Sequence, residues 1–213
     1  MKIYFISGLA ADSRVFKYIQ LPSYCEPVYL DWIPPKKNEN LSSYALRMAE
    51  KINFNERFSI IGLSFGGMIA SEIAKYHSPV HTILIASIPS SEHLPGYYRM
   101  ARSLGLHRII PVSFFRSAAL LKRLFTTETE EDKEILRTMI RQSDPHFIRW
   151  AMEAILYWDS KDIPPNLVHL HGSKDEILPK RYTKPSHIIP KAGHLMVMNR
   201  SGEINKILQE VLV

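Results

Sequence analysis

The feature that most constrains the fold of this chain is the alternation of short apolar runs with longer amphipathic stretches. The apolar runs occupy residues 3–7, 27–32, 58–63, 80–87, 167–171 and 186–190. Between them, segments such as residues 41–52 carry apolar side chains at helical spacing, and Asn40 is the expected N-cap of that helix. Continuous apolar runs are typical of strands that are buried on both faces. The pattern therefore predicts an α/β fold, with a mostly parallel sheet of about six strands flanked by helices.

The 213 residues are few enough to share one core, so we expect a single domain over residues 1–213. The long interval between the fourth and fifth runs lacks strand character but shows helical periodicity, for example at Ile135, Met139 and Ile140. A structureless loop of that length would be unusual in a compact domain. We therefore expect a helical cap insertion over about residues 90–160.

Composition excludes several classes of protein. Hydrophobic residues make up 46% and charged residues 23% of the chain, unlike disordered or fibrous proteins. Cys25 is the only cysteine, which excludes a disulfide framework and a cysteine-based zinc site. No apolar run approaches the roughly 20 residues of a membrane span, and residues 3–7 are too few for the core of an export signal. We expect a cytoplasmic protein that needs no cofactor.

The net charge of +6 leaves two interpretations open. Residues 93–127 contain no acid, and apolar residues alternate there with six basic ones: Arg99, Arg102, Arg108, Arg116, Lys122 and Arg123. This stretch suits a cap helix with its charged side in solvent, but also peripheral contact with an anionic membrane or an acyl substrate. No nucleic-acid recognition motif accompanies the charge, so we expect no nucleic-acid partner.

The most specific motif is Gly62-Leu63-Ser64-Phe65-Gly66-Gly67, which follows one expected strand and leads into the helix expected at residues 68–76. Glycines two residues before and after a serine allow a tight strand-to-helix turn, which presents the hydroxyl at the carboxyl edge of the sheet. The helix that follows directs its N-terminal N–H groups at the same place. The motif predicts a nucleophilic serine rather than a simple capping serine.

A serine hydroxyl needs a neighbouring base, and that base needs an orienting group. Downstream of Ser64, the strand at residues 167–171 leads into a turn that contains Asp175, and a later strand end is followed by Gly193 and His194. The order serine, aspartate, histidine, each after a strand, is that of the α/β-hydrolase triad.

On these residues the chain resembles the α/β-hydrolase superfamily over nearly its whole length. The resemblance is carried by the turn around Ser64 and by three further segments: Ser7-Gly8-Leu9, residues 171–175 (His-Gly-Ser-Lys-Asp) and Ala192-Gly193-His194. It implies the α/β-hydrolase fold, in a minimal version, with neither metal nor organic cofactor.

The resemblance also implies roles for individual residues. Ser64 corresponds to the nucleophile, His194 to the general base and acid, and Asp175 to the acid that orients the imidazole. The backbone N–H groups of Phe65 and Leu9 correspond to the oxyanion hole.

Two features depart from the family pattern. The first loop commonly reads His-Gly, whereas this chain has Ser7-Gly8, so we expect the loop to be held differently. The interval between Asp175 and His194 is too short for the full helix often found there, which leaves Asp159 and Asp162 as alternative acids.

Other candidate residues have weaker signals. Aromatic residues of the cap and of the second strand are candidate substrate contacts, and each also suits the core: Trp32, Tyr97, Phe114 and Trp150. His169 and His171 share one face of a strand, but no third ligand is nearby, so we expect no metal site. We expect His171 to shape the loop before Asp175.

The expected reaction is hydrolysis of a carboxylic ester or thioester of a small to medium acyl substrate, through an acyl-enzyme on Ser64. A serine at this position argues against the family members that use an aspartate nucleophile. Two alternatives remain: a lyase or carbon–carbon bond hydrolase with the same triad, and a non-catalytic ligand-binding protein on this scaffold.

Overall fold

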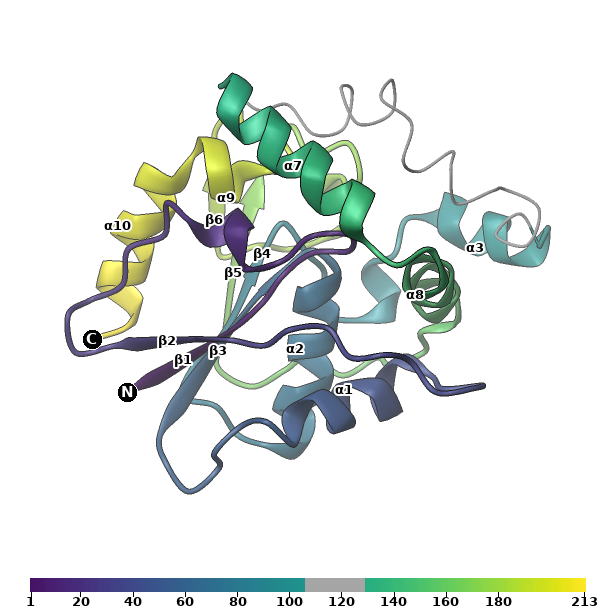
Figure 1. The fold of residues 1–213 in the computed structure, drawn as a ribbon, viewed down its shortest axis with the longest axis horizontal. Helices are drawn as coiled ribbons and strands as arrows, with labels where there is room; N and C mark the ends of the chain where they lie inside the picture. The colour runs from purple at the N-terminus through teal and green to yellow at the C-terminus, as the bar shows by residue number, and fades with distance from the viewer. Residues whose placement is uncertain (106–128) are drawn as a thin grey trace.

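The computed structural model of the protein describes residues 1–105 and 129–213. Within them lies one sheet of six strands in the order β2-β1-β3-β4-β5-β6, and all five neighbouring pairs are parallel (Figure 1). The strands are β1 (Lys2–Ile6), β2 (Glu26–Tyr29), β3 (Phe58–Leu63), β4 (Thr82–Ile85), β5 (Leu167–Gly172) and β6 (His187–Ile189). The prediction of a mostly parallel sheet of about six strands is confirmed.

Helices cover both faces of this sheet. The α-helices of the described residues are α1 (Leu41–Ala49), α2 (Phe65–Tyr76), α3 (Gly96–Ser103), α7 (Glu130–Gln142), α8 (Pro145–Tyr157), α9 (Met196–Asn199) and α10 (Ser201–Val211). Short 3₁₀ turns lie at η1 (Ser13–Phe16), η2 (Ser91–His93) and η3 (Lys180–Tyr182). Side chains of α1, α2 and α8 share one core cluster, and those of η1, α7, α9 and α10 share the other.

The alternation of side chains along the strands explains why both faces are apolar. Tyr4 and Ile6 of β1 belong to one core cluster, whereas Ile3 and Phe5 belong to the other, and all four are buried. Helix α1 starts where the sequence predicts. The Asn40 side chain accepts a hydrogen bond of 2.8 Å from the Ser43 N–H at the start of this helix.

The strand order has a switch point at β1. The chain leaves β1 toward β2 on one side and returns to β3 on the other side of β1. In open parallel sheets, ligands bind at such a switch point, beyond the carboxyl ends of the strands. Here the loop after β1 and the turn after β3 lie directly against each other, since a Cβ on Gly66 would lie 2.2 Å from the Ser7 carbonyl oxygen.

The helices between β4 and β5 contact both sides of the carboxyl edge. Leu136, Met139 and Ile140 of α7 pack in the cluster that contains Phe16, whereas Phe147 of α8 packs in the other cluster. In Figure 1, α7 runs across the molecule from the side of α9 toward α8. The limits of a cap at about 90–160, and the division into domains, stay predictions.

Several boundaries differ from the sequence prediction, and two of them lie close to Ser64. The second strand ends at Tyr29 rather than at Trp32, so Trp32 lies in the loop beyond it. Helix α2 begins at Phe65, directly after Ser64, three residues earlier than expected. In the described part of the chain, every helix is too short or too polar to cross a membrane.

Candidate active site

Ser64 occupies a sharp turn between β3 and α2. Its backbone angles, φ 51° and ψ −118°, lie in a region that residues with a side chain rarely adopt. Close backbone contacts explain the flanking glycines: a Cβ on Gly62 would lie 2.4 Å from the Gly66 carbonyl oxygen, and one on Gly66 would lie 2.2 Å from that of Ser7. The turn therefore requires glycine on both sides of the serine.

Ser87, which the sequence patterns did not single out, holds this turn from just beyond the end of β4. Its buried hydroxyl donates a hydrogen bond of 2.6 Å to the carbonyl oxygen of Ser64. The Ser64 N–H in turn donates to the Ile85 carbonyl oxygen at 2.9 Å. The sequence offered one signal for Ser87, namely a polar residue at the end of the strand expected at residues 80–87.

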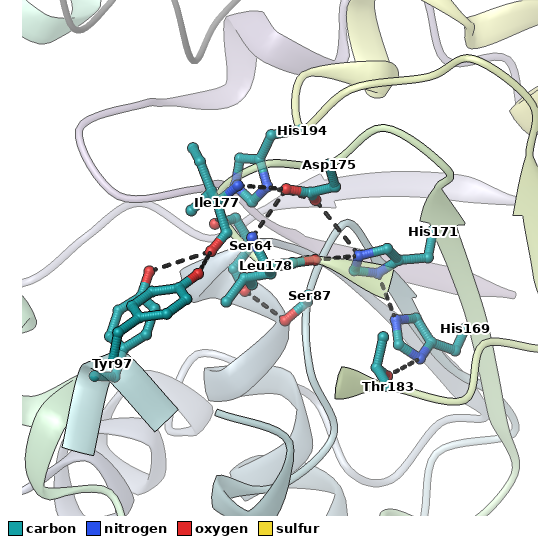
Figure 2. Close-up of polar contacts among 11 residues, drawn as sticks. Ser64, Ser87, Tyr97, His169, His171, Asp175, Ile177, Leu178, Thr183 and His194 are labelled. Carbon is teal, nitrogen blue, oxygen red and sulfur yellow. Dashed lines mark hydrogen bonds and ion pairs between the residues drawn. The ribbon is translucent and has the colours of Figure 1, made fainter. Parts of the chain in front are cut away.

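The side chains of Ser64, His194 and Asp175 form one hydrogen-bonded line (Figure 2). The Oγ of Ser64 lies 2.8 Å from Nε2 of His194, and Nδ1 of His194 lies 2.8 Å from Oδ2 of Asp175. Asp175 and His194 are each 5% exposed, whereas Ser64 is partly exposed and remains accessible to a ligand. The alternative acids, Asp159 and Asp162, lie exposed on the surface.

Backbone hydrogen bonds bring the segments of Asp175 and His194 together. Ser173 N–H donates to the Ile189 carbonyl oxygen at 3.0 Å, and Lys174 N–H donates to that of Ala192 at 2.8 Å. Burial would raise the pKa of Asp175, but the nearby His194 and its hydrogen bonds outweigh burial, so the pKa lies below its usual value. Asp175 is therefore ionised at neutral pH.

The two expected oxyanion donors border Ser64. Phe65 is the first residue of α2, and the loop that contains Leu9 approaches Ser64 so closely that a Cβ on Gly8 would lie 3.5 Å from the Ser64 Cβ. Within residues 1–105 and 129–213, neither the Leu9 N–H nor the Phe65 N–H donates a hydrogen bond. Both groups are consequently available to a ligand.

Ser7 shows how the first loop is held without the usual histidine. The Ser7 hydroxyl donates to the Ala11 carbonyl oxygen at 2.8 Å, and the Trp32 indole N–H donates to the same oxygen at 3.0 Å. Ala10 has a φ of 60°, which closes the loop between these contacts. The side chain directly after β1 and one from the loop after β2 thus fix the loop of Leu9.

Trp32 and Trp150 lie in an aromatic cluster beside the nucleophile turn. The Trp32 ring stacks on Phe65 with centroids 5.4 Å apart and lies 5.0 Å from Phe147 of α8. Trp150 lies 4.3 Å from the Tyr44 ring of α1. A groove of about 190 Å³ adjoins this cluster, lined by Ala10, Trp32, Ile33, Pro34, Ser143, Asp144 and Phe147.

Tyr97 lies on α3 near the loop of the acid. Its hydroxyl donates to the Ile177 carbonyl oxygen at 3.0 Å, and its side chain is 41% exposed. Phe114, the remaining candidate substrate contact, lies outside the described residues, as does most of the basic stretch.

The pair of histidines on β5 is engaged within the protein. His169 Nε2 lies 3.1 Å from His171 Nδ1, and both rings are buried. Among the residues that the structure describes, no three His, Cys, Asp or Glu side chains are grouped so as to hold a metal ion.

Comparisons with known proteins agree with this architecture. A sequence profile described as the Alpha/beta hydrolase family matches residues 3–207. No curated protein matches the sequence. Among solved structures, an esterase from Exiguobacterium antarcticum has a TM-score of 0.78 at 17% identity, over 98% of this chain and 90% of that one. MenH from S. aureus has a TM-score of 0.72 at 16% identity, over 100% and 93%. These structures confirm the predicted fold class.

Proposed function

Because the chain belongs to the alpha/beta hydrolase family, a family of enzymes, we propose that it is a serine hydrolase. In this proposal it cleaves a carboxylic ester or thioester of a small to medium acyl substrate through an acyl-enzyme on Ser64. Solved structures with the same fold include esterases from Exiguobacterium antarcticum and Thermogutta terrifontis, which supports the reaction class.

The observation that carries the proposal is the line from Ser64 through His194 to Asp175. An ionised carboxylate can only accept, so the contact of 2.8 Å with Asp175 assigns a proton to Nδ1 of His194. In a neutral His194, Nε2 is then the atom that accepts the hydrogen bond of the Ser64 hydroxyl, 2.8 Å away. His194 is thereby placed to accept the proton of the nucleophile.

Acylation follows from this geometry. The Ser64 Oγ attacks the substrate carbonyl carbon while its proton passes to Nε2 of His194. The carbonyl oxygen becomes negative and receives hydrogen bonds from the N–H groups of Leu9 and Phe65, and each such donor typically contributes about 2.7–4 kcal/mol. The tetrahedral intermediate then expels the alcohol or thiol, which takes the proton from His194.

Deacylation repeats these steps with water as the nucleophile. His194 removes a proton from water, and the hydroxide attacks the acyl carbon. Collapse of the second tetrahedral intermediate releases the carboxylic acid and returns the proton to Ser64. Asp175 remains ionised throughout and stabilises the imidazolium that forms twice in each cycle.

The substrate-binding part of the proposal rests on the aromatic side of the site. Trp32 and Trp150 would contact the acyl or leaving group near Phe65, and the adjoining groove of about 190 Å³ suits a small apolar group. Tyr97 and Phe114 would contribute from the cap, which we place at about residues 90–160 of a single domain.

A substrate series tests the proposal. Purified protein would be assayed with p-nitrophenyl esters and with acyl thioesters of increasing chain length, alongside Ser64→Ala. The proposal expects saturable hydrolysis of short to medium esters or thioesters that is lost in Ser64→Ala. Equal rates in both proteins would contradict it. Turnover of a carbon–carbon bond substrate alone would favour the lyase or carbon–carbon hydrolase alternative, and ligand binding without turnover would favour a binding protein.

A further inference from the structure

Two buried histidines extend from the acid of the candidate triad into the protein interior. His169 and His171 lie on the same face of β5, are 1% and 0% exposed, and have perpendicular rings with centroids 5.1 Å apart. The Thr183 hydroxyl lies 3.4 Å from His169 Nδ1, and His169 Nε2 lies 3.1 Å from His171 Nδ1. His171 Nε2 then lies 2.7 Å from the Leu178 carbonyl oxygen (Figure 2).

The Leu178 carbonyl oxygen, at the end of this row of side chains, determines the direction of the hydrogen bonds between them. The Leu178 carbonyl oxygen can only accept, so Nε2 of His171 carries the proton. Nδ1 of a neutral His171 must then accept, which makes Nε2 of His169 the donor. By the same reasoning, His169 Nδ1 accepts from the Thr183 hydroxyl. Each donor points toward Leu178. Burial lowers the pKa of both histidines, which keeps both rings neutral.

This row of hydrogen bonds ends at Leu178, one of the two residues whose backbone holds the Asp175 carboxylate. The N–H groups of Ile177 and Leu178 each donate a hydrogen bond of 2.9 Å to Oδ1 of Asp175. This arrangement leaves Oδ2 for Nδ1 of His194, at 2.8 Å. His171 Nε2 also lies 3.5 Å from the same Oδ2 atom. The orientation of the carboxylate thus depends on where the backbone of residues 177–178 lies.

We propose that His171 is a positioning residue that fixes Leu178, so that Asp175 presents Oδ2 to His194, and that His169 and Thr183 fix the tautomer of His171. The inference rests on the proposed function, because its consequence is catalytic. No atom of His171 contacts substrate in this proposal, and the loss of His171 is expected to lower kcat with little change in KM. A merely structural histidine would affect stability alone.

Two substitutions of His171 separate positioning from packing. In His171→Leu the side chain keeps comparable bulk but cannot donate to Leu178, whereas in His171→Gln the amide N–H₂ can replace that donor. With p-nitrophenyl butyrate, we expect kcat to fall about 10²-fold in His171→Leu, the typical cost of misplacing a catalytic group. We expect His171→Gln to stay within about tenfold of the wild type. Thermal unfolding of all three proteins controls for loss of fold.

A spectroscopic signal tests the same claim without turnover. The Nδ1 proton that His194 shares with Asp175 gives a far-downfield proton NMR signal in hydrogen-bonded imidazole–carboxylate pairs. We expect this signal to be present in the wild type and His171→Gln, and to be shifted or lost in His171→Leu. Folded His171→Leu with wild-type kcat and an unchanged signal would overturn the proposal.

Nitrogen-15 spectra of the histidines in the unmodified protein provide a test even if His171→Leu does not fold. The proposal requires neutral His171 with its proton on Nε2, assigned by the loss of its signals in His171→Gln. A proton on Nδ1 instead would overturn it, because His171 could not then donate to Leu178. Labelling of the wild type with a fluorophosphonate is run in parallel. An unlabelled wild type with the expected tautomer would contradict the proposed function and leave the positioning intact.

Discussion

The carboxyl edge of the sheet and the helices between β4 and β5 meet near Ser64 but are held in different ways. At the sheet edge, backbone contacts between short segments place each residue of the site. Ser64 N–H is bonded to Ile85 O, and Lys174 N–H is bonded to Ala192 O, at 2.9 and 2.8 Å. Such contacts leave each segment little freedom once the sheet has formed.

The helices between β4 and β5 are attached by side chains at separate places. Lys17 beside η1 pairs with Asp132 of α7 at 2.8 Å. The aromatic cluster of Trp32, Phe65 and Phe147 joins α8 to the nucleophile turn. Beyond α8, the buried carboxylate of Glu72 accepts a hydrogen bond of 2.6 Å from the Trp158 indole N–H.

This difference suggests that turnover can be altered at the sheet edge and stability at the side-chain attachments. Changes at the sheet edge should affect the chemical step or the whole fold. Changes at the side-chain attachments should affect stability more than the turnover of a small substrate.

The largest effect is expected for Ser64→Ala, because it removes the nucleophile. We expect kcat for a small ester to fall about 10⁶-fold, with a melting temperature close to that of the wild type. The matched control is Ser71→Ala, because Ser71 is a buried serine of the following helix whose hydroxyl donates only within α2, to Gly67 O at 3.0 Å. Equal loss of activity in both variants would show that the effect is structural.

A methyl group on the nucleophile turn should destabilise the whole fold. In Gly66→Ala, the added carbon would lie 2.2 and 2.3 Å from the backbone oxygens of Ser7 and Ile6, which cannot move aside independently. We expect the free energy of unfolding in urea to fall by about 3 kcal/mol. In the control Gly96→Ala, no heavy atom lies within 4 Å, and a change below about 0.5 kcal/mol is expected. Similar losses in both variants would contradict the close approach at Gly66.

Loss of the hydrogen bond between Trp158 and Glu72 should lower stability more than activity. Trp158→Phe keeps the aromatic ring but removes the N–H that donates to buried Glu72. We expect the free energy of unfolding to fall by about 2 kcal/mol, since a buried carboxylate loses a donor. The kcat for a small ester should change less than about twofold. A double-mutant cycle with Glu72→Leu, which has no acceptor, measures the coupling, and additive effects would show that the two side chains do not interact.

As the pH falls, the free energy of unfolding should first decrease through His169 of β5. The contact between Lys17 and Asp132 of α7 should be lost only at a lower pH. Burial, and secondarily His171, lower the pKa of His169 to about 3. Below about pH 6.5 the unfolded chain binds a proton at this residue that the folded protein does not, so stability falls as the pH decreases toward 3. The pKa of Asp132 is also lowered: burial would raise it, but the hydrogen bonds and charge of its partners outweigh burial. Asp132 therefore loses its contribution only below about pH 4.

Urea unfolding at pH 7 and pH 5 measures this difference. His169 alone should account for about 2 kcal/mol of stability lost between these two values. In His169→Gln that part of the pH dependence should be absent, whatever the stability of the variant at pH 7. An identical pH dependence in wild type and His169→Gln would contradict the assignment of a neutral, buried His169.

The comparison also explains which parts were predictable from sequence. The sheet edge depends on local signals: the strand at residues 58–63 was predicted with the bounds it has in the structure, and the glycine-flanked Ser64 follows it. Asp175 and His194 were placed by their order after strands, and the structure brings both to Ser64. Their catalytic roles stay predictions.

The attachments of the helical region were not predictable, because they join residues far apart in the chain. Lys17 and Asp132 are 115 positions apart (132 − 17), and neither belongs to a motif. Glu72 follows the apolar turns of α2, so no sequence pattern shows that its carboxylate receives the Trp158 N–H. His169 and His171 had a visible signal, alternation on one strand, but their tautomers depend on the Leu178 carbonyl, which only the folded loop provides.

The central claim, that the sheet edge activates Ser64, is tested most directly by intact-mass analysis after treatment with a fluorophosphonate. The account predicts one adduct per chain on the wild type and none on Ser64→Ala. Folded wild-type protein that stays unmodified by this probe, and by a smaller phosphonate able to pass the helices near the site, would contradict it.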